Sequence, residues 1–93
     1  MGSVIQTGRE CYICRTTIGL HKHHLLHGTA NRKIADRYGY WVYLCAMHHE
    51  EVHMDAKLDK EFKKIAQRHF EQTGTREDFR RVFGKSYLED NDE

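Results

Sequence analysis

The alternation of hydrophobic and polar residues along the 93-residue chain predicts two short strands in its first half. Apolar residues placed around a group of histidines indicate a first strand that runs as far as Gly28. Residues 40–44 are rich in aromatic and β-branched side chains and follow Gly39, which indicates a second strand. The polar stretch 28–33 is expected to be a loop, so the two strands should form a hairpin with a long loop.

The pattern changes to helical spacing after Cys45, where good helix-forming residues follow directly. A longer helix is expected over about residues 59–73, because apolar side chains recur there at intervals of three and four. Gly74 is expected to end it. Thr75 then offers an N-cap for a short final helix whose apolar stripe stops before Gly84. The last two helices are expected to support the sheet and the first helix.

Composition limits the chain to one small domain, and the predicted elements make it α+β. The chain is 39% hydrophobic and 31% charged, as in globular proteins, and it has no apolar run long enough for a membrane span. A domain of this size buries a modest share of its surface, so we expect an additional staple. The single domain 1–93 is predicted to comprise a core at 11–54, supporting helices at 55–88 and an acidic tail at 89–93.

Charge is unevenly distributed along the chain, although the formal net charge is only +1. Four of the 14 acidic residues lie in the last five positions, which leaves 15 basic residues against 10 acidic ones before them. That part of the chain could approach a phosphate backbone. An ordinary solvated surface explains the same excess equally well, so charge alone does not identify a partner.

Two short pairs of cysteine and histidine have the spacing of a zinc site. Two residues separate Cys11 from Cys14 and Cys45 from His48, and such pairs can converge on one tetrahedral ion. The spacing also allows His49 as the fourth ligand. Three unrelated buried thiols are the competing interpretation, but it leaves the regular spacing unexplained. We expect a structural zinc that couples metal binding to folding, in a reducing compartment where these thiols form no disulfides.

Six further histidines fall within thirty-three residues, which is more than packing requires: His21, His23, His24, His27, His49 and His53. His49 and His53 lie four apart and would present two imidazoles on one helix face, a spacing suited to a single metal ion. Helical pairs of this kind also occur as surface residues. The adjacent doublet His23 and His24 adds weight to a functional interpretation.

The order of these features resembles that of the HNH, or ββα-metal, nuclease superfamily. The shared features are a Cys-x-x-Cys pair, a His-His doublet on a strand, a hairpin and a Cys-x-x-His-His-x-x-x-His helix, over roughly residues 11–53. Within them, residues 28–33 and 42–45 look like those of small HNH-type proteins encoded by phages and prophages. The layout of histidines also resembles that of the colicin DNases, in which a doublet precedes an H-x-x-x-H helix.

The resemblance implies roles for individual residues. His24 matches the second histidine of the doublet and would be the general base, while His23, His49 and His53 would hold a catalytic ion. A neutral imidazole can take a proton from water at neutral pH, and a divalent cation can stabilise charge on the phosphate and on the departing 3′ oxygen. Basic residues flank this site and could either hold phosphates or form ordinary surface: Lys22, Arg32, Lys33 and Arg37.

Two features depart from the family pattern. Aromatic residues fill the stretch where the family's central asparagine usually orients the base, so Asn31 is the only candidate for that role, and a backbone carbonyl or Asp36 could hold His24 instead. Adjacent residues on a regular strand also point to opposite faces, so His23 and His24 can share a site only at a bulge or a strand end. His21 shares a strand face with His23 and could substitute for it.

These features together predict a metal-dependent endonuclease that hydrolyses phosphodiester bonds of double-stranded DNA with little sequence specificity. The resemblance implies a cytoplasmic phage or prophage protein in a bacterial host. Zn²⁺ is expected as the structural ion, and Mn²⁺, Ni²⁺, Co²⁺, Mg²⁺ or Zn²⁺ as the catalytic one. The alternative is a catalytically silent zinc-binding module that binds nucleic acid or a protein partner. Metal sequestration would explain the histidines but not the regular spacing of the cysteines.

Overall fold

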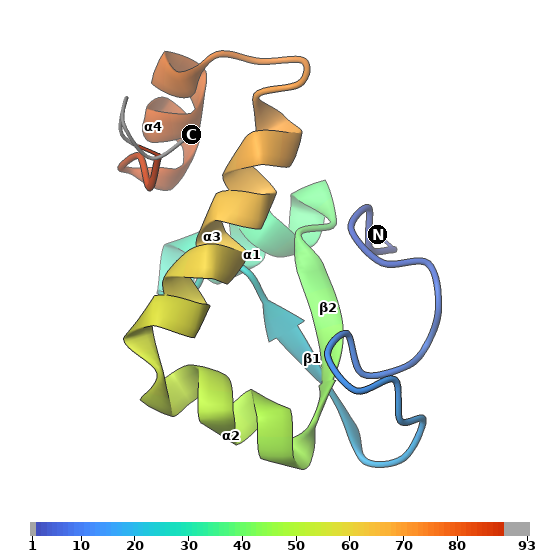
Figure 1. Cartoon of the computed structure of the whole chain (residues 1–93). Coiled ribbons are helices and arrows are strands. Elements are labelled where there is room, and N and C mark those ends of the chain that lie inside the picture. Colours follow the sequence, from blue (N-terminus) through green and yellow to red (C-terminus); the bar gives the residue numbers. More distant parts are fainter. Residues whose placement is uncertain (1, 89–93) are drawn as a thin grey trace.

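The computed structural model describes residues 2–88 of the chain (Figure 1). The described residues form a small α+β fold, as predicted, with a two-stranded antiparallel sheet and four helices. The elements in chain order are β1 (Leu20–His24), α1 (Thr29–Tyr38), β2 (Trp41–Cys45), α2 (Ala46–Met54), α3 (Ala56–Phe70) and α4 (Arg76–Phe83). The predicted acidic tail at residues 89–93 lies outside this part of the chain. None of the described helices is both long and apolar enough to cross a membrane.

The sheet is a hairpin in which five consecutive residues of β1 pair with five of β2. β1 ends at His24 rather than at Gly28, because the chain leaves the ladder there and buries Leu25 and Leu26 completely in the core. β2 lies within one residue of its predicted position, and only Tyr43 of its five residues is not buried. The predicted pair of strands is therefore confirmed, with a shorter β1.

The N-terminal segment runs beside the free edge of β2 (Figure 1). Tyr43 donates its backbone N–H to Oε1 of Gln6 at 2.8 Å, and its carbonyl accepts the N–H of Tyr12 at 2.8 Å. The Ser3 hydroxyl donates to the carbonyl of Trp41. These bonds satisfy backbone groups that an edge strand would otherwise leave unpaired. They also hold the chain that carries the first two cysteines beside β2.

The prediction of a loop at residues 28–33 is wrong, because most of that stretch belongs to α1. The apolar residues that bury this helix come late: Ala35 is fully buried in the core and Ile34 packs against it. The helix ends at Gly39, which adopts a left-handed φ of +78° and returns its N–H to carbonyls of the last turn. The polar first turn concealed the helix, and the hairpin therefore encloses a helix rather than a long loop.

The two C-terminal helices begin at capping residues. α3 starts earlier than predicted, after Asp55, whose carboxylate accepts two N–H groups of the first turn, and it ends at Phe70 rather than near Gly74. The Thr75 N-cap of α4 is confirmed, because its hydroxyl accepts the N–H of Asp78 at 3.0 Å. Both helices are thus started by side chains that are visible in the sequence.

α3 links the two ends of the molecule, because it lies against α2 at one end and against α4 at the other (Figure 1). Its buried Phe62 packs edge-on against the ring of His23 on β1, with ring centroids 5.7 Å apart. The core that joins these helices to the sheet includes Leu25, Leu44, Val52, Phe62, Ala66, Phe79 and Phe83. α3 therefore places an aromatic side chain against β1, while α4 packs against α1 and α3.

The close approach at Gly39 generates the first testable prediction. A Cβ at this position would lie 2.5 Å from the carbonyl oxygen of Gly2, in addition to the cost of a left-handed φ for alanine. Gly39→Ala should lower the free energy of unfolding by more than about 1 kcal/mol. Gly19 is the matched control, because its φ is +64° and a Cβ there would meet nothing within 4 Å. Thermal melts showing equal losses for Gly39→Ala and Gly19→Ala would contradict the prediction.

Candidate metal centres and active-site pocket

Three cysteines and one histidine meet where the N-terminal segment, the end of β2 and the start of α2 come together. Their ligand atoms, one from each of Cys11, Cys14, Cys45 and His48, all lie within 4.8 Å of one another. The Sγ atoms of Cys14 and Cys45 are 3.9 Å apart, and Nδ1 of His48 lies 3.6 Å from Sγ of Cys11 and 3.3 Å from Sγ of Cys45. The two pairs predicted from spacing are therefore brought together.

These distances fit the edges of a zinc tetrahedron. Bonds of about 2.3 Å to sulfur and about 2.05 Å to nitrogen would place two sulfurs about 3.8 Å apart and a sulfur and a nitrogen about 3.6 Å apart. Among the two histidines that the spacing allowed, the structure places His48 with the cysteines and His49 in a different cluster. The described cluster is thus a Cys₃His group whose geometry is compatible with zinc.

Local backbone structure explains why the cysteines converge. The first pair sits in a tight turn in which Cys11 N–H donates to the carbonyl of Thr16 and Arg15 N–H donates back to Cys11. Burial alone would raise the pKa of the Cys11 thiol, but hydrogen bonds from the backbone of this turn and of Cys45, and from His48, lower it to about 6. The thiolate form that binds metal is therefore favoured at neutral pH.

Three other histidines form a second cluster between β1 and α2. Single ligand nitrogens of His23, His49 and His53 all lie within 4.8 Å of one another, and the Nε2 atoms of His49 and His53 are 3.2 Å apart. For bonds of about 2.1 Å, two nitrogens would be about 3.4 Å apart at tetrahedral angles and about 3.0 Å apart at right angles. The observed separation falls between these values and fits two ligands of one ion.

His23 contributes a buried and unpartnered nitrogen to this cluster. Its side chain is only 3% exposed, and its Nε2 atom has no hydrogen-bond partner among the described residues. Such a group costs about 1–3 kcal/mol when it is left unsatisfied. Burial, together with the nearby His49 and His53, lowers the pKa of His23 from 6.5 to about 4, so its ring is neutral at pH 7. A cation bound by the three rings would satisfy the buried nitrogen.

His21 lies outside the three-histidine group. Its ring is close to that of His49, with centroids 5.1 Å apart, but its side chain is exposed and its nitrogens do not join those of the other three. Burial, and then the nearby His53 and His21, lower the pKa of His49, which favours its neutral form. Of the two histidines on this face of β1, the structure brings His23 rather than His21 to the cluster.

The histidine doublet meets the geometric demand set by its strand. Regular pairing continues through both residues, so there is no bulge between His23 and His24, but His24 is the last residue of β1. Both residues nevertheless line one pocket of about 330 Å³. Its lining residues are Lys22, His23, His24, His27, Gly28, Arg32, His49 and His53. The proposed base and the proposed ion ligands therefore share a cavity.

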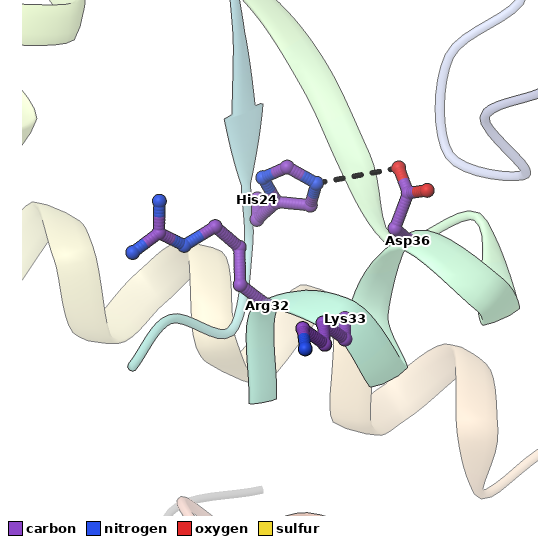
Figure 2. A pocket seen from close by; sticks show the side chains of 4 residues that line it. All are labelled: His24, Arg32, Lys33 and Asp36. Atoms are coloured by element: carbon purple, nitrogen blue, oxygen red, sulfur yellow. Dashed lines mark hydrogen bonds and ion pairs between the residues drawn. The ribbon is translucent and has the colours of Figure 1, made fainter. Parts of the chain in front are cut away.

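Asp36 is the described partner of His24. Its Oδ1 lies 3.3 Å from Nε2 of His24 (Figure 2). The same oxygen also accepts from the ammonium of Lys22. Hydrogen bonds from Lys22 and His24 lower the pKa of Asp36, so the carboxyl is ionised at neutral pH and can only accept. A neutral His24 must then carry its proton on Nε2, which leaves Nδ1 as the basic nitrogen. Of the two alternatives to the family asparagine, the structure provides Asp36.

Basic side chains from α1 line a second cavity next to His24. Arg32, Lys33 and Asp36 come from α1 and His24 from β1 (Figure 2). Arg32 lines both cavities, whereas Arg37, also predicted to contact nucleic acid, is an exposed residue of α1 that is not among the lining residues of either. Three of the four predicted basic contacts, Lys22, Arg32 and Lys33, thus lie at the cavities.

Asn31 is placed away from the role predicted for it. It belongs to α1 rather than to a loop, and its side-chain amide donates to the carbonyl of Phe83 at the end of α4, at 3.1 Å. That hydrogen bond links α1 to α4. Asn31 is not a described partner of His24, so the structure gives it a contact between helices rather than one with the base.

Comparison of the chain with protein-family models, with curated proteins and with solved structures found no match. Function is therefore argued from the two clusters and from the pocket that His23, His49 and His53 help to line.

The Cys₃His group predicts that metal binding and folding are coupled. Purified protein should hold about one tightly bound zinc per chain, and Cys14→Ser should lose it and melt at least about 10 °C lower, because a change of a few kcal/mol shifts the Tm of so small a domain by that much. Zinc content and circular dichroism would be measured together. His21→Ala is the control and should keep both zinc and Tm; a zinc-free protein with an unchanged Tm would disprove the coupling.

The three-histidine cluster predicts a second, separable ion site. His53→Ala should remain folded with its zinc but lose at least about tenfold in affinity for Mn²⁺ or Co²⁺, because one of three ligands is removed. Calorimetric titration of the zinc-loaded protein would measure this. His69→Gln is a matched control, since His69 bonds to Tyr40 away from the cluster. Equal affinity in wild type and His53→Ala would rule out the site.

Proposed function

We propose that the chain is a metal-dependent DNA endonuclease of the HNH type, which hydrolyses phosphodiester bonds with His24 as general base. The observation that carries this proposal is the single pocket lined by both His24 and the cluster of His23, His49 and His53. A base and an ion site on one cavity are what metal-assisted hydrolysis requires. A Cys₃His zinc next to this pocket would be structural.

The proposed reaction uses the tautomer of His24 that Asp36 selects. With Nε2–H donated to the carboxylate, Nδ1 can accept a proton from the attacking water, in the way that a carboxylate orients other catalytic histidines. An ion held by the three imidazoles would supply positive charge for the phosphate and for the departing oxygen. Arg32 lines the same pocket and would bind a non-bridging phosphate oxygen.

The charges around the pocket support a nucleic acid as the substrate class. Lys22 and Arg32 line the pocket and Lys33 lies in the adjoining cavity, so a phosphodiester backbone would meet basic groups there. We take double-stranded DNA as the substrate and the cytoplasm of a phage-carrying bacterium as the setting. These basic side chains would contact phosphates rather than base edges, which corresponds to weak sequence specificity.

A second candidate is a catalytically silent zinc-binding module that binds nucleic acid or a protein partner. The observation that favours it is Asn31, the only candidate for the family's central asparagine, whose amide is engaged with Phe83 instead. We rank it below the nuclease because a silent module needs neither the three-histidine cluster nor the His24–Asp36 hydrogen bond.

A plasmid-nicking assay with ions restored after chelation tests the proposal. Wild-type protein should convert supercoiled plasmid to nicked circles with Mn²⁺, Ni²⁺ or Co²⁺ and less efficiently with Mg²⁺, because three imidazoles favour transition metals over a hard, oxygen-preferring ion. His24→Ala should bind the ion normally yet lose at least about 10²-fold in rate. Asp36→Asn should lose about 10- to 100-fold, as expected for an orienting partner.

Asp78→Asn is the control for Asp36→Asn, since Asp78 is paired with Arg81 on the surface of α4. It should cut at the wild-type rate. Absence of cleavage with every ion, on single- and double-stranded DNA, would leave the binding module as the explanation. Wild-type cleavage by His24→Ala would show instead that another group is the base.

A further inference from the structure

His27 is a pocket histidine that belongs to neither metal cluster and that has no role in the reaction proposed above. It lies in the segment between β1 and α1, and it lines the same cavity as His24 and the three clustered histidines. Its Nε2 is 2.9 Å from Oδ1 and 3.1 Å from Oδ2 of Asp59, a residue of the first turn of α3. Thirty-two positions separate the two residues, so nothing in the local sequence pattern indicated the contact.

Asp59 is held in its ionised form. Burial by itself raises the pKa of the carboxyl, but hydrogen bonds from Lys63 and His27 outweigh this effect and place the pKa below its ordinary value. The ammonium of Lys63 binds Oδ2 at 2.9 Å. The carboxylate can therefore only accept, so the ring of His27 carries a proton on Nε2 and has Nδ1 as its second functional nitrogen.

Two histidines of the pocket, His24 and His27, thus each hydrogen-bond to a carboxylate that also pairs with a lysine, but the two arrangements differ. At Asp36, the same oxygen accepts from both His24 and Lys22, and the carboxyl side chain is 43% exposed. At Asp59, His27 lies within hydrogen-bond distance of both oxygens, Lys63 binds Oδ2 alone, and the side chain is only 17% exposed. The carboxylate is consequently closer to the histidine ring and less exposed at His27 than at His24.

We propose that His27 is the general acid of the hydrolysis, which protonates the departing oxygen while His24 takes the proton of the attacking water. This inference rests on the proposed nuclease function. It gives the two histidine–carboxylate arrangements complementary roles in one pocket, and it gives α3 a part in the chemistry through Asp59.

The proton balance of the step is complete. Water forms the new bond to phosphorus and gives one proton to Nδ1 of His24, while the bond from phosphorus to the 3′ oxygen breaks. The departing oxygen takes the proton from Nδ1 of the His27 imidazolium, which becomes neutral and keeps Nε2–H on Asp59. Exchange with solvent then removes a proton from His24 and returns one to His27, so no further reactant is needed.

The alternative is that the contact between His27 and Asp59 is purely structural and only links the β1–α1 segment to α3. A change of leaving group separates the two roles, because a thiolate leaves without protonation whereas an alkoxide gains from an acid. The probe is a DNA duplex in which sulfur replaces the bridging 3′ oxygen at one linkage. For each variant, the cleavage rate at that linkage with Mn²⁺ is divided by the cleavage rate of the ordinary duplex. Effects of sulfur on the ion are the same for every variant and cancel when these ratios are compared.

His27→Gln is the principal variant, since glutamine can still donate a hydrogen bond to Asp59. It should lose about 10²-fold on the ordinary duplex and stay within about threefold of wild type at the sulfur linkage. Asp59→Asn should show the same selectivity with a smaller loss, and His24→Ala should lose equally on both duplexes. Asp78→Asn should leave both rates unchanged. Zinc content and Tm verify that each variant is folded.

Two results would overturn the inference while leaving the nuclease in place: an equal loss on both duplexes in His27→Gln, which indicates a structural tether, or no loss on either. Failure of the wild-type protein to cut either duplex with any ion would instead remove the proposed function, and the role of His27 with it.

Discussion

Cys45 is the residue through which the rest of the site is positioned, because it ends β2 and also precedes the first turn of α2. Its sulfur and the ring of His48 meet the two cysteines of the N-terminal turn, so a tetrahedral ion would clamp the start of α2 against two other segments. Once that start is fixed, helical geometry determines where His49 and His53 point. A structural ion at one end of the helix would thereby set the second ion site along it.

The burial of His23 makes sense only within this arrangement. Phe62 of α3 packs against its ring and removes it from water, while Nε2 remains unsatisfied by any described group. Buried polar atoms in folded proteins are usually satisfied by a protein group, an ordered water or an ion. Packing by Phe62 therefore desolvates the His23 ring and keeps the imidazole neutral. A neutral imidazole is the form that binds metal.

The pocket also balances charge. A phosphodiester would be repelled by Asp36 and Asp59, but each carboxylate is paired with a lysine, and Arg32 lines the cavity with no described carboxylate partner among the ion pairs. In the proposed nuclease, the acidic groups could then hydrogen-bond to the histidines without opposing the approach of DNA. This separation of tasks explains why acidic and basic residues are interleaved around a site proposed to bind DNA.

Many structural features of this protein can be predicted from local sequence. Two-residue spacing sufficed for the Cys₃His group, four-residue spacing for His49 and His53, and Thr75 for the start of α4, because each depends on chain geometry over a few residues.

Contacts across 12 to 52 positions escaped prediction or stayed open: Asp36 with His24, Asp59 with His27, and the amide of Asn31 on Phe83. The choice of His48 over His49, and the helix at residues 29–38, were also decided by packing. Only tertiary structure could decide these, because the partners are brought together by burying Ala35, Phe62 and Phe79 in a common core, and no local pattern encodes which polar groups that burial leaves adjacent.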